Sequence, residues 1–410
     1  MKLTTKLLAA SAIVSASAAQ AVELEVTHWW TSGGEAAAVA EFAKAFNEKT
    51  EHTWVDGAIA GGGGTARPIM ISRITGGDPM GATQLNHGRQ AEELIEAGLM
   101  LDLTDVAEAE GWADIVQPSS LLESCTVDGR IYCAPVNIHS WQWIWLSHKA
   151  FADAGVDVPT NWDEFVAAAP ALREAGKVPL AMGQQPWQSS GAFGVMAIAI
   201  AGQDAWSAVN IDKNAEVAAG PEYAKVFEAA AAAREFAEGS NVQDWNQATN
   251  MVITGEAGGQ IMGDWAQGEF QVAGQVAGED YTCLPGLGVN EIISTGGDAF
   301  YFPKQDDPEV EAAQKELAAL LLSPEVQVNF NLAKGSLPIR GDVDLAAAND
   351  CMRKGLEILA SGAILPDGNQ TLSPDTSGQI EDLMVEFWND TSYTAADAQA
   401  RFAEIIGDAD

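Results

Sequence analysis

Strand-like and helix-like patterns alternate along most of the chain, and this alternation limits the possible fold more than any other feature. Residues 22–29 alternate apolar and polar side chains as a strand does, and residues 31–46 show the apolar spacing of a helix. Further strand-like segments lie at residues 53–55, 178–182 and 300–302, with helical patterns between them. Alternation of this kind is typical of α/β proteins. We therefore expect an α/β fold with helices packed against largely parallel sheets.

The first 21 residues have the features of a secretory signal peptide. Lys2 and Lys6 supply positive charge, residues 7–14 form an apolar core, and Ala19-Gln20-Ala21 is an A-x-A cleavage site. We therefore expect cleavage after Ala21 and a periplasmic protein that begins at Val22. No later apolar run reaches eighteen residues, so a soluble product is predicted. The rest of the 410-residue chain exceeds what one hydrophobic core usually supports, which favours two lobes.

The chain is strongly acidic, with 58 acidic and 21 basic residues and a net charge of −37. Such a surface disfavours binding to nucleic acid or to anionic lipid. The acidic residues are spread along the sequence, so they indicate a solvated surface and not an acidic tail. A neutral ligand fits this charge better than an acidic one.

The four cysteines are an even number in a chain with an export signal, which predicts two disulfides. Cys125 and Cys133 flank the segment TVDGRIY, where the Asp-Gly pair at 128–129 is typical of a hairpin turn. A three-residue loop centred on the glycine would set these two cysteines opposite each other, and Cys283 and Cys351 would then form the second disulfide. Metal ligation and free thiols are weaker alternatives, because no CxxC motif occurs and no histidine lies close enough for a zinc pattern. No metal and no cofactor are predicted.

A tryptophan and a carboxylate follow a short apolar run at residues 259–262, within the stretch GEAGGQIMGDWAQGEF. In open α/β sheets, ligands bind beyond the carboxyl ends of the strands, which is where Asp264 and Trp265 are expected. An indole face matches the C–H face of a pyranose ring, and a carboxylate can accept two hydroxyl hydrogen bonds. The alternative is a strand end covered by a tryptophan of the core.

The first strand ends in a similar way, at His28-Trp29-Trp30. Neighbouring residues on a strand point to opposite sides, so at least one of the two indoles is expected to face a cleft. Ser32 is a plausible N-cap for the next helix, and Glu35 lies in its first turn. This corner could bind hydroxyl groups, or Glu35 could only complete a capping box with Ser32.

Two further segments invite a ligand-binding interpretation. The glycine run at residues 61–64 lacks the Gly-Lys-Ser/Thr of a phosphate-binding loop, so we favour a close approach of its backbone to a ligand or to a neighbouring strand. His87 lies on a strand-to-helix turn, where it could donate to a hydroxyl group or simply lie at the surface.

Tryptophans recur elsewhere in the chain. Trp141, Trp143 and Trp145 alternate strictly, which indicates one face of a buried strand and favours a core position for most of them. Trp187 follows the strand at residues 178–182 among glutamines, and Trp245 precedes a helix.

Six segments together carry a resemblance to a known family. They are HWWTSGGE at 28–35, AGGGG at 60–64, APVNIH at 134–139, DWNQAT at 244–249, GDWAQGEF at 263–270 and KGSLPIR at 334–340. With these segments the chain resembles the solute-binding proteins of ATP-binding-cassette (ABC) sugar importers, and most of all the branch that binds glucose and mannose. The resemblance runs from the signal peptide to the C-terminus, and the cysteine pair 283 and 351 also matches that branch.

The resemblance implies a two-lobed periplasmic-binding-protein fold, type II-like, with the ligand cleft between the lobes. We expect residues 22–133 and about 296–340 to form the N-terminal lobe. Residues from about 134 to 295, together with 341–410, are expected to form the C-terminal lobe.

The resemblance also implies the sugar contacts. Stacking and hydroxyl-binding roles fall on Trp29, Trp30, Glu35, His87, Trp245, Trp265, Asp298 and Lys334. Members of the branch carry a histidine where the late loop of this chain has Asp367, which we include as a candidate. A second departure is Gln267, which stands where a lysine is usual.

The predicted function is that of an extracytoplasmic receptor, without enzymatic activity, that delivers a neutral monosaccharide to the transmembrane subunits of an ABC permease. Glucose, mannose or a related aldose is the expected ligand, and a monomer without nucleic-acid partners is the expected state. One alternative is a secreted glycoside hydrolase that uses Glu35 and Asp264, which would need two carboxylates about 5 to 10 Å apart. Another is a receptor for an oligosaccharide or a glycosylated osmolyte, which pocket size would distinguish.

Overall fold

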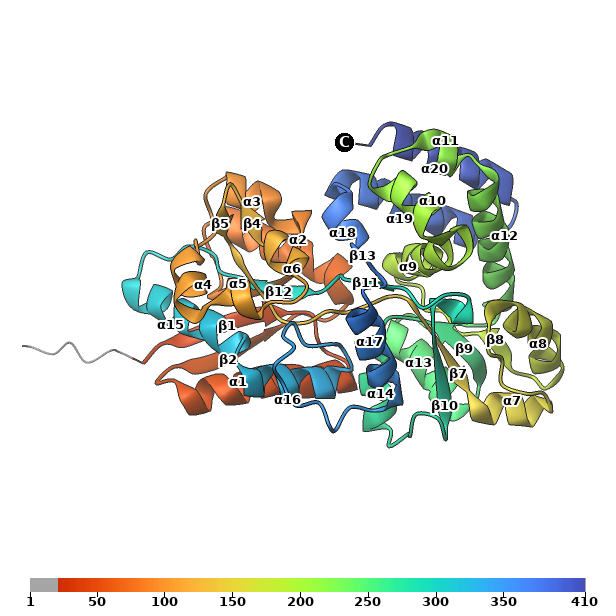
Figure 1. Ribbon diagram of the computed structural model, residues 1–410, viewed down its shortest axis with the longest axis horizontal. Coiled ribbons are helices and arrows are strands. Elements are labelled where there is room, and N and C mark those ends of the chain that lie inside the picture. The colour runs from red at the N-terminus through yellow and green to blue at the C-terminus, as the bar shows by residue number, and fades with distance from the viewer. Residues whose placement is uncertain (1–20, 410) are drawn as a thin grey trace, which may run out of the picture.

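The computed structural model describes residues 21–409, which form two lobes placed side by side (Figure 1). Each lobe is built on one main sheet with helices on it, which confirms the predicted α/β class and two-lobed architecture. The predicted signal peptide lies outside the described residues, apart from Ala21.

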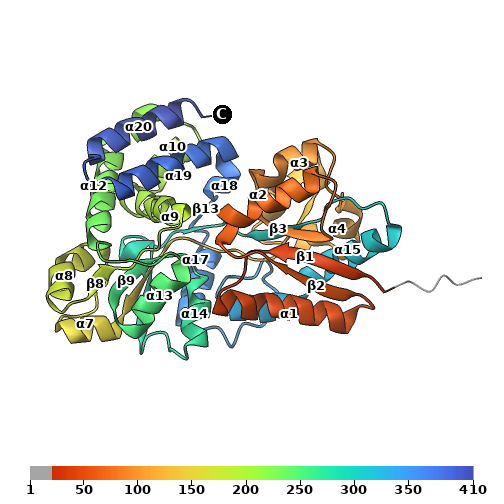
Figure 2. The same cartoon turned by 180° about the vertical axis from the view of Figure 1, so that it is seen from behind.

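The first lobe is built on a five-stranded sheet of order β2-β1-β3-β12-β6. The strands β1, β2 and β3 are parallel, whereas β12 runs antiparallel to both of its neighbours. The helices α1 and α16 cover one face, and α2 and α3 lie on the other (Figures 1 and 2). These elements span β1 Glu23–His28, α1 Gly33–Lys49, β2 Thr53–Ala58, α2 Gly62–Thr75, β3 Ala82–Asn86, α3 Glu92–Glu96, β6 Cys133–Pro135, β12 Asp298–Tyr301 and α16 Pro324–Lys334.

Shorter elements complete this lobe around the same sheet. They are the 3-10 turn η1 Arg89–Ala91, α4 Thr104–Glu110, α5 Trp112–Ile115, α6 Ser120–Glu123, β4 Thr126–Val127, β5 Arg130–Ile131 and α15 Pro308–Leu321.

The second lobe is built on a four-stranded sheet of order β10-β7-β9-β8. Only β8 and β9 are parallel, while β7 runs antiparallel to both β9 and β10. The prediction of largely parallel sheets is therefore wrong for this lobe. The chain enters β7 directly from the other lobe, without the helical crossover that makes neighbouring strands parallel. The strands are β7 Trp143–Ser147, β8 Val178–Leu180, β9 Ala257–Ile261 and β10 Tyr281–Pro285.

Helices pack around the second sheet and form a further layer at one end of the lobe, where α9, α12, α19 and α20 lie together (Figure 1). Their bounds are α7 His148–Ala154, α8 Trp162–Glu174, α9 Pro186–Met196, the π-helical segment η2 Ala197–Ala201, α10 Gly202–Asn210, α11 Ala215–Ala218, α12 Pro221–Phe236, α13 Trp245–Thr254, α14 Ala266–Val272, η3 Gly286–Gly288, α17 Asp350–Ser361, α18 Gly368–Thr371, α19 Pro374–Asn389 and α20 Ala395–Gly407.

Three segments of the chain cross between the two lobes. They are residues 136–142, 286–297 and 335–349, which join β6 to β7, β10 to β12 and α16 to α17. The crossing segments also pair with one another, through the bridges Ile138↔Leu337 and His139↔Gly296. A two-stranded sheet of β11 Ile293–Ser294 and β13 Ile364–Leu365 lies on the second crossing segment.

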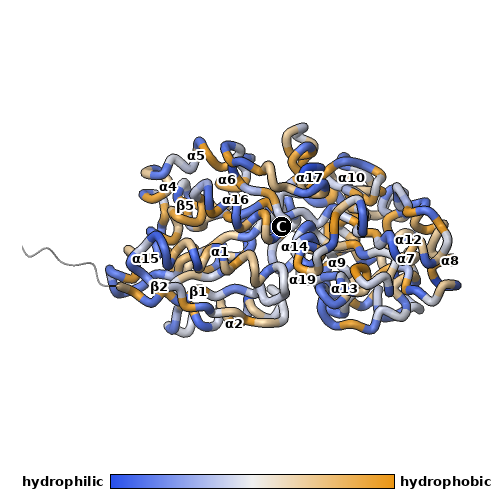
Figure 3. The backbone as a smooth tube through the Cα atoms, turned by 90° about the horizontal axis from the view of Figure 1, so that it is seen from below, coloured by the Kyte–Doolittle hydropathy of each residue, from blue (hydrophilic) through white to orange (hydrophobic). Residues whose placement is uncertain are grey.

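Apolar residues concentrate inside both lobes, and Figure 3 shows apolar stretches in each of them. One helical run in the described part of the chain, Pro186–Asn210, is by length and composition long and apolar enough to cross a membrane. Half of its most apolar window is buried within the second lobe, against α12 and α19, as in a core helix. Polar residues such as Gln188 interrupt this run, which is why no continuous apolar segment is visible in the sequence.

Both predicted disulfides are present, between Cys125 and Cys133 and between Cys283 and Cys351. The predicted three-residue loop is wrong, however. Thr126 pairs with Ile131, so the turn has only two residues, both with positive φ. This shorter turn places Tyr132, and not Cys133, opposite Cys125, and the disulfide joins Cα atoms 5.1 Å apart just beyond the hairpin.

Candidate functional site

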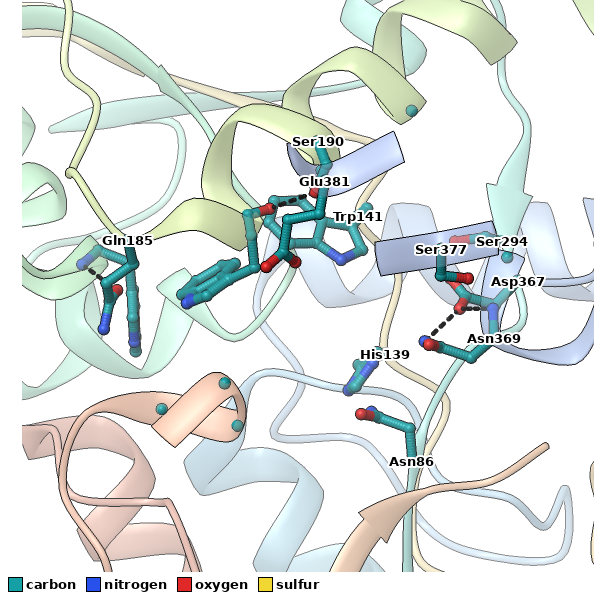
Figure 4. A pocket seen from close by; sticks show the side chains of 18 of the residues that line it. Asn86, His139, Trp141, Gln185, Ser190, Ser294, Asp367, Asn369, Ser377 and Glu381 are labelled. Atoms are coloured by element: carbon teal, nitrogen blue, oxygen red, sulfur yellow. Dashed lines mark hydrogen bonds between the residues drawn. The ribbon is translucent and has the colours of Figure 1, made fainter. Parts of the chain in front are cut away.

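A cavity of about 510 Å³ lies between the two lobes. Its walls come from the ends of β1 and β3, from the start of α2, from the crossing segments and from helices of the second lobe (Figure 4). All but one of the predicted binding residues line it: Trp29, Trp30, Glu35, Trp245, Trp265, Asp298, Lys334 and Asp367. The structure thus brings together side chains that lie up to several hundred positions apart.

His87 is the exception, because it does not reach the cavity. Its ring lies against Gly297, where an added Cβ atom would meet Nε2 at 2.4 Å, and only 1% of the residue is exposed. Gln370 contacts the other ring nitrogen at 3.2 Å. Burial lowers the pKa of His87 to about 3, so the ring is neutral and lies behind the wall of the cavity.

Glu35 and Lys334 form a buried ion pair at one wall, with Nζ 3.3 Å from the carboxylate. Ser32 caps α1 by accepting from the Glu35 backbone N–H, and its hydroxyl lies 3.3 Å from the Glu35 carboxylate. Ser32 is thus the N-cap, whereas the Glu35 side chain pairs with Lys334 and lines the cavity. Burial raises the pKa of Glu35, and Lys334 opposes this rise. The Lys334 ammonium also lies 5.5 Å and 5.9 Å from the ring centroids of Trp30 and Trp265.

Asp298 is held by donors from two other elements. Its carboxylate accepts from Gln84 at 2.8 Å and from Asn137 at 3.0 Å, and it lies 3.2 Å from Nδ1 of His139. Burial by itself would raise the pKa of Asp298, but His139 and Lys334 hold it well below its usual range. Against its own burial, the Asp298 carboxylate raises the pKa of His139. Asp298 and His139 thus each stabilise the charged form of the other.

Indole rings from three segments meet on the second-lobe side of the cavity. Trp141 lies 4.9 Å from Trp265 and 5.4 Å from Trp187, centroid to centroid, and each pair is edge to face. Trp143 and Trp145 are fully buried in the core, as expected for that strand face. Trp141 departs from this pattern because β7 begins only at Trp143. Trp141 therefore lies outside the strand, and its side chain need not point to the same side as those of Trp143 and Trp145.

The glycine run at residues 61–64 lies at the start of α2 and lines the cavity. A Cβ atom at Gly62 would be 3.5 Å from Trp187 and 3.6 Å from Gln185, both of which belong to the other lobe. Gln185 also donates to the Gly61 carbonyl at 3.5 Å. The backbone of the glycine run thus approaches side chains of the opposite lobe and borders the cavity. The neighbour that it approaches is not a strand.

Asp264 does not line the cavity, contrary to the expectation of a hydroxyl acceptor at this strand end. It is 2% exposed, and its carboxylate accepts from the Ser140 backbone N–H at 2.9 Å. Burial raises the pKa of Asp264 to about 7. Its neighbour Gln267 is likewise buried and donates to the Gly335 carbonyl. Asp264, just before α14, and Gln267, within it, both bond to crossing segments. Because Asp264 does not line the cavity, a hydrolase pair of Glu35 and Asp264 has no geometric basis there.

Residues 30–328 match the family described as bacterial extracellular solute-binding protein. The chain belongs to this family. It is 36% identical over 362 residues to a probable sugar-binding periplasmic protein of Rhizobium meliloti (strain 1021), a match that covers 88% of this chain and 86% of that protein.

Solved structures support the same fold for this solute-binding protein. A chitin oligosaccharide binding protein superposes with a TM-score of 0.78 at 20% identity, covering 95% of this chain and 99% of the other. The solute receptor AcbH, described as having an exclusive substrate preference for β-D-galactopyranose, superposes with a TM-score of 0.75 at 19% identity, covering 94% and 98%. Because these two proteins bind ligands of different length, the shared fold does not determine the ligand.

Several cavity residues of this solute-binding protein were not singled out from the sequence. They include Arg67, Asn86, His139, Gln142, Ser294 and Glu381. Gln142 and Ser294 carry buried side-chain oxygens without a hydrogen-bond partner among the described residues. Arg67 directly follows the glycine run, which is a signal that could have been used. Glu381 lies in an ordinary helical pattern and has no such signal. In the described part of the chain, no three His, Cys, Asp or Glu side chains gather as a metal site would require.

Proposed function

We propose that this protein is an extracytoplasmic receptor that binds a neutral monosaccharide and presents it to the permease of an ABC importer. The observation that carries the proposal is the cavity between the lobes, where indole rings and charged side chains with hydrogen-bonding capacity line the same space. Glucose, or a related aldose such as mannose, is the proposed ligand. Periplasmic location and a monomeric state are part of the same proposal.

The charged groups of the cavity can both donate to and accept from hydroxyl groups. Lys334 has three N–H donors, and one of them is directed to Glu35. The Asp298 carboxylate has about four acceptor positions, of which Gln84, Asn137 and His139 occupy three. The remaining positions suit ring hydroxyls. An epimer that leaves one of these buried groups unpaired loses roughly 1 to 3 kcal/mol of binding free energy.

The aromatic side chains supply the apolar part of the site. Trp265 and Trp141 present ring surface to the cavity, and a pyranose buries its C–H faces against such rings. The relatives support a sugar as ligand, since the Rhizobium meliloti protein is named as a probable sugar-binding periplasmic protein. In two-lobed receptors a ligand held by both lobes favours the closed form, which a permease can distinguish from the open form.

A titration of the mature protein tests this proposal. Protein stripped of ligand by unfolding and refolding is titrated with glucose, mannose, galactose, xylose and several disaccharides, and binding is followed by tryptophan fluorescence and calorimetry. We expect one monosaccharide bound per chain, a change in indole emission, and recovery of the sugar unchanged. Binding of disaccharides alone would contradict the monosaccharide proposal, and consumption of any sugar would contradict the receptor proposal.

A further inference from the structure

Arg67 projects into the cavity from α2, in the first lobe, and is not neutralised by a direct partner. Its guanidinium lies against Gly63, where an added Cβ atom would be 3.4 Å from Nη1. The same guanidinium lies 6.0 Å from the ring centroid of Trp29. Within the described residues, this guanidinium makes no hydrogen bond and no ion pair. A half-buried cation with unused donors therefore faces the space where a ligand would lie.

Glu381 projects into the same cavity from α19, in the second lobe (Figure 4). It too lacks a hydrogen bond or an ion pair in the part of the chain that the structure describes. Burial raises the pKa of the Glu381 carboxyl, and the charge of Arg67 lowers it. The Arg67 pKa is affected in the complementary way, lowered by burial and raised by Glu381.

The two charges thus act on each other across the cavity without touching. A charge that is partly removed from water and has no direct partner is destabilised, and either the opposite charge or polar groups of the ligand can offset this. An uncharged sugar leaves the pair balanced and can accept from Arg67 while it donates to Glu381. A ligand with its own charge is attracted by one member and repelled by the other.

We propose that Arg67 and Glu381 are specificity-determining residues, which balance each other across the bound ligand and so select an uncharged sugar over its acidic and amino derivatives. This inference rests on the proposed sugar-binding function. It concerns selectivity, so removal of one member should change the ranking of ligands and not only the affinity for all of them.

The test compares glucose, glucuronate and glucosamine as ligands of the full mature chain, by calorimetry at low salt. Glu381→Gln leaves Arg67 unbalanced, and we expect the affinity for glucuronate relative to glucose to rise about tenfold. Arg67→Gln leaves Glu381 unbalanced, and we expect the same gain, about tenfold, for glucosamine relative to glucose. In the double variant both ratios should return toward those of the native chain.

Two matched variants control for the change in net charge. Asp382→Asn removes an exposed carboxylate next to Glu381, and Arg73→Gln removes a guanidinium of α2 that is paired with Glu25 outside the cavity. Ratios that stay within about twofold of the native chain, or that shift equally in these controls, would overturn the proposal. Absence of glucose binding, and of binding by any neutral sugar, to the native chain would instead count against the sugar-receptor function on which it rests.

Discussion

At the level of single residues, Asp264 shows how burial changes the chemistry of a carboxylate that the local sequence presents as a ligand contact. The Asp264 carboxylate accepts from the Ser140 backbone N–H, and the Asp264 backbone N–H donates to the Ser140 carbonyl at 3.0 Å. These two bonds fix the first crossing segment at the residue next to His139. Since its folded pKa is raised to about 7, the folded state favours the protonated form. Its role is to position the cavity wall.

This shift predicts a pH dependence of stability. A carboxyl with a raised folded pKa stabilises the fold below its unfolded pKa, about 4, and loses this contribution as pH rises through its folded pKa. Asp264→Asn removes the titrating group, so relative to the native chain its unfolding free energy should increase between pH of about 4 and 7, by up to roughly 4 kcal/mol. Urea unfolding at a series of pH values measures this difference. A difference that is constant across that range would contradict the assignment.

At the level of elements, α1 and α14 bring the two lobes together at a contact made of glycines. An added Cβ atom at Gly34 would lie 2.5 Å from the Gly268 carbonyl carbon. The Glu269 side chain accepts from the Gly34 backbone N–H at 2.8 Å, which satisfies a free donor at the start of α1. The close approach of α14 to α1 thus places Trp265 beside Lys334, the partner of Glu35.

Gly34→Ala should therefore separate α1 from α14 and weaken the site without touching a ligand. We expect at least a tenfold loss of sugar affinity together with roughly 1 to 3 kcal/mol of lost stability, as for other overpacked contacts. Calorimetric titration and urea unfolding measure the two effects. Gly378→Ala is the matched control, because nothing lies within 4 Å of its added Cβ atom in α19. The control should be neutral or stabilising by about 0.5 to 1 kcal/mol.

At the level of the whole molecule, the two disulfides constrain the chain over very different lengths. Cys125 and Cys133 are 8 positions apart and close a local hairpin, whereas Cys283 and Cys351 are 68 positions apart and join β10 to α17. The longer loop contains two of the crossing segments and the end of the first lobe, so this bond ties the second lobe together across an excursion of the chain into the first.

Replacing each cysteine pair by serine should reveal this difference in thermal or urea unfolding. Loop-closure entropy predicts that the free energy of unfolding falls by roughly 4 kcal/mol when Cys283 and Cys351 are both replaced by serine. The expected fall is roughly 2.5 kcal/mol when Cys125 and Cys133 are both replaced. An equal or reversed order would show that local packing, and not loop length, dominates the contribution of these disulfides.

Much of the local structure follows from the sequence alone, because it depends on neighbours along the chain. The Ser32 cap, the strand that ends at His28 and the α/β alternation arise from capping chemistry and residue periodicity. The position of Trp30 and Glu35 at the cavity wall also follows from where the strand ends and the helix begins. Recognition of the family extended this to residues far apart, such as Asp298 and Lys334.

Other features were decided only by the tertiary structure, because they depend on how distant segments pack. His87 lies against Gly297 and does not line the cavity, whereas Trp141 does, because β7 begins two residues later. The partner of His139 is Asp298, which lies 159 positions away in the sequence. Arg67 and Glu381 line the cavity from opposite lobes, and no local sequence pattern shows that they face the same space. Sequence periodicity thus specifies which face of an element is apolar, whereas the packing of the lobes determines which polar residues meet across the cavity.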